Sequence, residues 1–357
     1  MDLDDIVKSK ELDSQNMLGE IENLPDQLAA AWTLGQAQPD PRPAGRIARV
    51  LISGMGGSAI GADLLMAYIA PLCPVPVVIQ RDYGLPAWAY GPETLVIASS
   101  HSGNTEETLD SFEAALMNKC SLLAICTGGK LEQRAAASRI HIWKFTHKGQ
   151  PRAAVGFSFG LLLAAFSRLG LLGEASTSAD ELAEAVEAMK KQQERLRPGV
   201  PVTGNPAKLQ AGLLVGRWVN VYGSGALAPV ARRWKGQINE IAKAGAGFEA
   251  LPEADHNALA GLHNPGEVLA RTLTLFLRAP SDHPRNALRS ELTQQGFMLE
   301  GLATDGYLAQ GESRLAHIWT ALHFGDYMAY YLAMAYGTDP TPVKMLENFK
   351  AAMQAAW

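Results

Sequence analysis

Short apolar runs of strand length alternate with segments of helix length through most of this 357-residue chain. In the first half, five runs rich in Val, Ile and Leu are separated by segments with a helical period or by turns. This alternation is typical of a parallel β-sheet whose strands are joined by helical crossovers. It therefore predicts an α/β domain over about residues 45–150. The predicted strands are residues 49–54, 76–80, 94–100, 121–127 and 140–145.

The same pattern returns in the second half of the chain. A strand, a turn rich in Gly and Ser, and a helix occur near residues 50–70 and again near 218–243. We interpret this recurrence as a diverged duplication, which predicts two similar α/β domains with doubly wound parallel sheets. In the second half we expect strands at 218–223, 247–251 and 272–277, and helices at 226–244, 314–336 and 343–356.

The segments outside the two strand-rich regions are predicted to be mainly helical. The first forty-odd residues predict an acidic helical arm that ends in a Pro-rich linker at 38–43. A mostly apolar helix starts at Pro151, where proline suits a first helical turn, and a charged helix follows over about 179–195. The expected organisation is an arm at 1–45, a first domain at 46–175 and a second domain at 176–357 that includes a C-terminal helix.

Composition excludes several functional classes. Lys plus Arg is 31 and Asp plus Glu is 36, so the formal net charge is −5 and a nucleic-acid partner is not expected. The densest apolar stretch, about residues 155–166, is too short to span a bilayer, and the acidic N-terminus does not resemble a signal peptide. Three cysteines provide neither a disulfide framework nor paired metal-ligand spacing. We expect a soluble cytoplasmic protein without a membrane partner.

A first candidate for anion binding is the sequence GMGGS at residues 54–58, between a predicted strand and a predicted helix. Small residues such as Gly57 allow an anion to approach the backbone, and the helix N-terminus offers free N–H groups beside Ser58. The alternative is a tight turn that merely requires glycine. The sequence matches neither the dinucleotide-binding GxGxxG pattern nor a phosphate loop that ends in Gly-Lys-Ser/Thr.

A second candidate is SSHSGNTEET at residues 99–108, which ends a predicted strand and opens a helix. Ser100, Ser102 and Thr105 carry hydroxyls, and Asn104 with the neighbouring N–H groups completes a cup. Such a cup binds a phosphomonoester without a metal, although Ser and Thr are also ordinary capping residues. Two such turns at the carboxyl ends of strands in one sheet favour an anion-binding crevice.

These two motifs are similar to those of the sugar isomerase (SIS) domain, which binds phosphosugars. The SIS signature Ser-x-Ser-Gly-x-Thr matches Ser100, Ser102, Gly103 and Thr105. The segment GSGALAPVARRWKGQINEIAKAGAGFEALPEADHN, the Pro-Arg step at 151–152 and the ending TPVKMLENFK resemble the bifunctional phosphoglucose/phosphomannose isomerase family. The resemblance extends from about residue 45 onward. It implies two flavodoxin-like SIS domains and a homodimer.

The reaction of that family requires an acid/base for ring opening, a base beside C1 and C2, and a cation beside the enediolate. The resemblance implies that Glu240 is the proton-transfer base, although a Glu on a helix is by default a solvated surface charge. It implies that His256 opens the ring and is contributed across the dimer interface. Arg152 matches the arginine that stabilises the enediolate.

The resemblance also implies a lysine near the chain end. Lys350, which follows Phe349, is preferred to Lys344, because the family's lysine lies close to the end of the chain. A threonine near Thr341 would leave room for both C2 epimers, while His101 has no assigned role. The substrate phosphate would be bound by Gly57, Ser58, Ser100, Ser102 and Thr105.

The expected function is metal-free, cofactor-free interconversion of glucose 6-phosphate, mannose 6-phosphate and fructose 6-phosphate through a cis-enediolate. One alternative is another SIS enzyme, such as the isomerase half of a glucosamine 6-phosphate synthase, although residue 2 is Asp2 and not the catalytic Cys of that enzyme. A second alternative is a non-catalytic sugar-phosphate sensor with a DNA-binding arm. Residues 1–45 are too acidic and too short to favour it.

Overall fold

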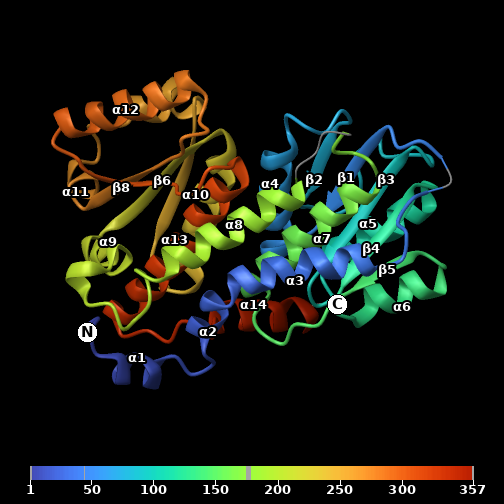
Figure 1. Ribbon diagram of the computed structural model, residues 1–357, viewed down its shortest axis with the longest axis horizontal. Helices are drawn as coiled ribbons and strands as arrows, with labels where there is room; N and C mark the ends of the chain where they lie inside the picture. The colour runs from blue at the N-terminus through green and yellow to red at the C-terminus, as the bar shows by residue number, and fades with distance from the viewer. Residues whose placement is uncertain (1, 44, 174–177, 356–357) are drawn as a thin grey trace. The chain divides into compact units, whose positions relative to one another are not determined.

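A computed structural model describes residues 2–43, 45–173 and 178–355 of the chain (Figure 1). It contains two compact units, each with its own sheet. The five-stranded unit comprises the described parts of 23–188 together with 311–318, and the four-stranded unit comprises the described parts of 1–22, 189–310 and 319–357. The domain boundaries expected from the sequence, after residues 45 and 175, stay predictions.

The sheet of the five-stranded unit is parallel throughout, with the order β2-β1-β3-β4-β5. This is the flavodoxin-like doubly wound order, in which the chain reverses its direction of winding between β1 and β3. Ligands of such sheets bind beyond the carboxyl ends of the strands at that reversal. All five strands expected in this region are confirmed: β1 Arg49–Ser53, β2 Val77–Gln80, β3 Thr94–Ser100, β4 Ser121–Cys126 and β5 His141–Lys144.

Helices cover the sheet of this unit, and every residue of β3 is buried in consequence. The helices α3 and α7 cross where side chains are small: a Cβ added to Gly160 would lie 2.6 Å from the Cβ of Ala31. Close packing of this kind requires Gly or Ala at the crossing. The helical elements are α3 Leu24–Ala37, α4 Gly56–Ile69, α5 Glu106–Met117, α6 Gly129–Ala137, η1 Pro151–Ala154, α7 Val155–Arg168 and α8 Ser178–Gln193, which continues into the other unit.

The four-stranded sheet is also parallel and has the order β7-β6-β8-β9. This repeats the arrangement of β2-β1-β3-β4, which confirms the expectation of two similar α/β domains. The sequence did not predict β9, because its residues ATDGYL form an edge strand that is only partly buried and lacks a dense apolar run. The strands are β6 Trp218–Ser224, β7 Ala246–Leu251, β8 Thr272–Arg278 and β9 Ala303–Leu308.

Two layers of helices enclose this second sheet (Figure 1), with α11 and α12 on one side of β6 and β8, and α10 on the other. Trp234 of α10 stacks on Phe324 of α13 and donates to the carbonyl of Ala321 at 2.8 Å. The helical elements are α1 Ile6–Leu12, α2 Met17–Glu22, η2 Val202–Gly204, α9 Pro206–Leu214, η3 Gly225–Leu227, α10 Ala228–Glu240, η4 Glu253–His256, η5 Ala258–Ala260, α11 Gly266–Leu269, α12 Pro284–Leu299, α13 Arg314–Tyr336 and α14 Lys344–Ala355.

The helix expected over 226–244 is shorter than predicted. It ends at Glu240, and Lys243 adopts a left-handed conformation with φ of 52°. The chain therefore leaves the helix before residue 244, and the apolar periodicity of the sequence does not reveal this turn. Among the helices in the described ranges, none combines the length and apolarity needed to cross a bilayer.

Candidate active site

Two loops come together at the carboxyl edge of the five-stranded sheet. The GMGGS turn follows β1, the SSHSGNT turn follows the adjacent strand β3, and the two strands are paired in register. A Cβ added to Gly54 would lie 2.9 Å from the carbonyl oxygen of Ser99 and 3.2 Å from the Cβ of Ser58. Glycine at residue 54 therefore lets the first turn pack directly against the second.

The turn after β3 is organised by its own hydroxyls. The Ser100 and Thr105 hydroxyl oxygens lie 2.9 Å apart, and the Gly103 N–H donates to Ser100 Oγ at 3.1 Å. Thr105 is the N-cap residue of α5, yet no side-chain cap is made there within the described residues. The first-turn N–H groups of α5 therefore have no side-chain cap, and an anion could accept hydrogen bonds from them. Asn104 N–H in turn donates to Ser102 Oγ at 3.2 Å.

The segment that joins β4 to α6 makes hydrogen bonds to this turn. The N–H and the hydroxyl of Thr127 both donate to the carbonyl of His101, at 3.1 and 2.7 Å. Gly103 has φ of +66°, and a Cβ there would lie only 1.8 Å from the carbonyl oxygen of Gly128. Only glycine satisfies both the backbone conformation and the close approach.

Replacement of Gly103 tests this arrangement. We expect Gly103→Ala to lower the free energy of unfolding by at least about 2 kcal/mol, because alanine adds left-handed strain and a backbone clash. Urea denaturation measures the change. The matched control is Gly199→Ala, since residue 199 has no atom within 4 Å of an added Cβ. Equal stability of the two variants would contradict the packing described for the turn.

Arg152 lies beside the first turn. It belongs to the 3-10 turn η1, which starts at Pro151, and its side chain is buried. A Cβ added to Gly57 would lie 2.4 Å from the carbonyl oxygen of Pro151 and 3.4 Å from the Cα of Arg152. Residues 57 and 152 are far apart in sequence, yet their backbones are in contact. The structure thus brings Gly57 and Arg152 together.

A glutamine that the sequence analysis missed holds the segment after Arg152. Gln27 of α3 is buried and donates through Nε2 to the carbonyl of Ala153 at 2.9 Å. Its Oε1 accepts from the N–H of Gly156 at 2.8 Å. The amide therefore bridges the junction of η1 and α7. A lone Gln within an amphipathic helix has no sequence signal that would have identified this role.

His101 has a partner that the sequence also did not indicate. Its Nε2 lies 3.0 Å from Nδ1 of His147, so one ring donates to the other. Phe145 and Phe157 stack nearby with ring centroids 5.0 Å apart, and both histidine rings contact this aromatic pair. The histidine in the second turn is thereby joined to the segment between β5 and Arg152.

Glu240 and His256 both belong to the four-stranded unit, but they lie near opposite ends of its parallel strands. Helix α10 begins beyond the carboxyl end of β6 and runs back, so Glu240, its last residue, lies towards the amino end of β7. His256 is exposed on η4, beyond the carboxyl end of β7. The two ends of β7 are separated by the length of its six residues, which is roughly 20 Å. Within one chain the structure does not bring these two residues together.

The position of Glu240 is not explained by helix stability. A carboxylate in the last turn faces the negative end of the helix dipole, which disfavours it. The segment after α13 lies at the same edge: Lys243 Nζ donates to the carbonyl of Asp339 at 2.8 Å, and the buried Thr341 donates through its N–H to Asp339 Oδ1 at 3.0 Å. The structure thus places Thr341 at the same edge of the sheet as Glu240.

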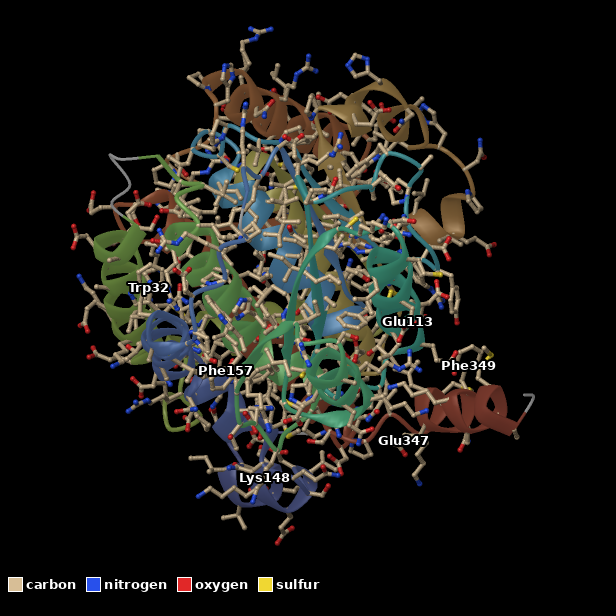
Figure 2. The ribbon with its side chains drawn as sticks, turned by 90° about the vertical axis from the view of Figure 1, so that its right-hand side faces the viewer. Trp32, Glu113, Lys148, Phe157, Glu347 and Phe349 are labelled. Atoms are coloured by element: carbon tan, nitrogen blue, oxygen red, sulfur yellow. The ribbon has the colours of Figure 1, made fainter. Side chains whose placement is uncertain are left out.

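The two candidate lysines both lie on α14. Lys344 is its first residue and Lys350 follows almost two turns later, and both side chains are exposed. Figure 2 shows Glu347 and Phe349 of this helix with their side chains standing out from it. Since Lys344 and Lys350 are both exposed, the choice of Lys350 stays a prediction.

Comparison with known proteins reveals relatives over almost the whole chain. A bifunctional phosphoglucose/phosphomannose isomerase of Caldicellulosiruptor bescii is 38% identical over 337 residues, which is 94% of this chain and 98% of that protein. A protein of the same name from Aquifex aeolicus is 33% identical over 85% of this chain and 90% of its own length. The chain belongs to the bifunctional phosphoglucose/phosphomannose isomerase family.

A family model agrees with this membership, and a solved structure shares the fold. Residues 203–353 match the bacterial phospho-glucose isomerase C-terminal SIS domain, a range that contains Glu240, His256 and Lys350. The crystal structure of a hypothetical protein from Thermus thermophilus is similar in fold, with a TM-score of 0.74 and 17% identity, over 98% of this chain and 93% of that one.

No metal site accompanies these residues in the part of the chain that the structure describes. Within it, no three His, Cys, Asp or Glu side chains gather closely enough to hold a metal ion.

Proposed function

We propose that this protein interconverts glucose 6-phosphate, mannose 6-phosphate and fructose 6-phosphate by metal-independent aldose–ketose isomerisation through a cis-enediolate. The observation that carries this proposal is the similarity, over nearly the full length, to two proteins named bifunctional phosphoglucose/phosphomannose isomerase. The cup of hydroxyls and free helix N–H groups after β1 and β3 supports it, because such groups suit a phosphomonoester.

In this proposal the phosphate is held by the two turns of the five-stranded unit. Hydroxyls and backbone N–H groups would donate to the phosphate oxygens at the N-termini of α4 and α5, where the helix dipoles favour negative charge. The adjacent buried guanidinium of Arg152 would stabilise the enediolate charge. The proposed phosphate ligands are Gly57, Ser58, Ser100, Ser102 and Thr105.

The proton transfers are assigned to the four-stranded unit. Glu240 would remove a proton from C2 of an aldose, or from C1 of the ketose, and deliver to the other carbon a proton that has exchanged with solvent. His256 would open the sugar ring, a task that suits imidazole at neutral pH. Lys350 would add positive charge near the sugar. Thr341 would leave room beside C2 for both epimers.

We also propose that the working enzyme is a homodimer. The separation of Glu240 and His256 by the length of β7 supports this assembly, since neither residue can reach the other's edge within one chain. A second copy can supply the missing histidine, and a two-fold dimer would supply it to both sites equally.

Incubation with fructose 6-phosphate in D₂O tests the proposed reaction. We expect glucose 6-phosphate and mannose 6-phosphate to form at comparable rates, each with deuterium at C2, because one enediolate leads to both epimers. NMR spectroscopy follows both products. The enzyme is first treated exhaustively with EDTA, which is expected to leave the rate unchanged.

A different outcome of this experiment would contradict each part of the proposal. Glucose 6-phosphate alone, after many turnovers, would mean that the enzyme is specific for one epimer. Products without deuterium at C2 would exclude proton exchange through an enediolate. Activity that is lost after EDTA treatment and restored by zinc would exclude metal independence.

A further inference from the structure

A cavity of about 130 Å³ lies in the four-stranded unit, on the face of the sheet that α12 covers. Its floor consists of residues that parallel register places side by side. Asn220 of β6 lies beside Thr274 of β8, and Tyr222 of β6 lies beside Glu249 of β7. Alternate residues of a strand share one face, so both pairs point into the same space. Apolar side chains, among them Leu262, complete the walls.

Two mostly buried side chains, Tyr222 and Thr274, carry hydroxyls that have no hydrogen-bond partner among the residues that the structure describes. Tyr222 is only 4% exposed, and its ring packs between Phe276 and Phe297, with centroids 5.2 and 5.8 Å away. Its hydroxyl makes no hydrogen bond to any described residue. The hydroxyl of Thr274, which is 1% exposed, likewise makes none within those residues. Their side chains line the cavity, so a ligand or water that occupies it can pair with both hydroxyls.

Tyr222 remains a hydrogen-bond donor here. Burial raises the pKa of Tyr222 to about 12, and the negative charges of Glu249 and Asp255 act in the same direction. The phenol therefore keeps its proton at neutral pH.

The two carboxylates near Tyr222 differ in their partners. Asp255 accepts from Arg289 Nη1 at 3.0 Å and from Thr293 Oγ1 at 2.7 Å, so its charge is compensated. Glu249 is half-buried and makes neither a hydrogen bond nor an ion pair with any of the described residues. A carboxylate in this position attracts a cation, because partial burial weakens the screening of its charge by water.

We infer that the cavity binds a small organic ammonium ion of the amino-alcohol class. The ammonium group would donate to the Glu249 carboxylate, and the ligand's hydroxyl would pair with Tyr222 or Thr274. The short carbon chain would pack on the apolar wall that includes Leu262 and Leu269. A cavity of about 150 Å³ accommodates benzene, so this one accommodates about five or six non-hydrogen atoms. A hexose phosphate is much larger than that.

This cavity is separate from the groups assigned to isomerisation. Phosphosugar ligands of open parallel sheets bind beyond the carboxyl ends of the strands. The cavity lies instead over the middle of β6 and the amino half of β8, on the face opposite α10. The inference is therefore independent of the proposed function and stands or falls separately.

Ordered water is the competing occupant, since a polar cavity of this size accommodates several molecules. Water satisfies the hydroxyls but gives the site no preference for positive charge. A comparison of a cation with a neutral ligand of the same size and shape therefore distinguishes the two occupants.

Ligand-detected NMR titration of the full-length protein makes this comparison. The probes are 1-amino-2-propanol and 1,2-propanediol, which differ only in the ammonium group. We expect saturable binding of the amine, with a dissociation constant in the millimolar range and at least about tenfold tighter than that of the diol. No saturable binding of the amine, or equal binding of the two probes, overturns the inference.

Two isosteric variants assign the preference to this cavity. Glu249→Gln should remove the preference for the amine, and Tyr222→Phe should weaken amine binding several-fold. The matched control is Glu291→Gln, which removes an exposed carboxylate from α12. Amine binding that survives in Glu249→Gln, or that is lost equally in Glu291→Gln, overturns the assignment. Thermal unfolding confirms that each variant is folded, and the comparison of probes on the unmodified protein requires no variant.

Discussion

Replacing Glu240 by Gln is expected to lower kcat by about 10²–10⁴-fold while fructose 6-phosphate still binds. The change preserves the shape of the side chain but removes the proton acceptor, and general-base catalysis contributes typically that much. Binding should persist because the proposed phosphate ligands, the turns after β1 and β3, are untouched. Steady-state kinetics give kcat, and inhibition by inorganic phosphate reports on the phosphate site.

The control for this prediction is Glu291→Gln, on another helix of the same unit, which should retain normal turnover. Near-normal turnover in Glu240→Gln would mean that Glu240 is not the base. A loss of phosphate inhibition together with turnover would mean that the substitution disturbs binding and not proton transfer.

Mixing two inactive variants is expected to restore activity. If each site uses Glu240 of one copy and His256 of the other, a dimer of one Glu240→Gln chain and one His256→Gln chain has one intact site. Random assembly makes half of the dimers mixed, so co-expression should give about one quarter of normal activity. Each variant alone should remain at its own low level.

The control is co-expression of the normal chain with a chain that carries both substitutions. Mixed dimers then contain no intact site, and only the dimers of two normal chains contribute, again about one quarter. Failure of the two single variants to complement each other, in dimers shown to be mixed, would mean that His256 does not act across subunits.

Much of the fold is determined by local sequence pattern. Eight of the nine strands in the described ranges were evident from the sequence, and the apolar runs of β1, β3 and β4 are long because both faces of a parallel sheet are covered. The exception, β9, lies at the edge of its sheet as β2, β5 and β7 do, but its sequence ATDGYL lacks a dense apolar run. The turns proposed to bind phosphate were also evident locally, since a turn that contacts an anion must contain small residues and hydroxyls next to each other in the chain.

The sequence by itself thus determined the α/β class, the duplication, the two turns and, by resemblance, the residues proposed for chemistry. Only the tertiary structure decided which of them are neighbours. It placed Gly57 against Arg152, linked His101 to His147, separated Glu240 from His256, and left a cavity beside Tyr222. The physical reason is that strand and turn formation depend on residues a few positions apart. Packing, burial and unpaired hydroxyls depend on residues that meet only when distant segments fold together.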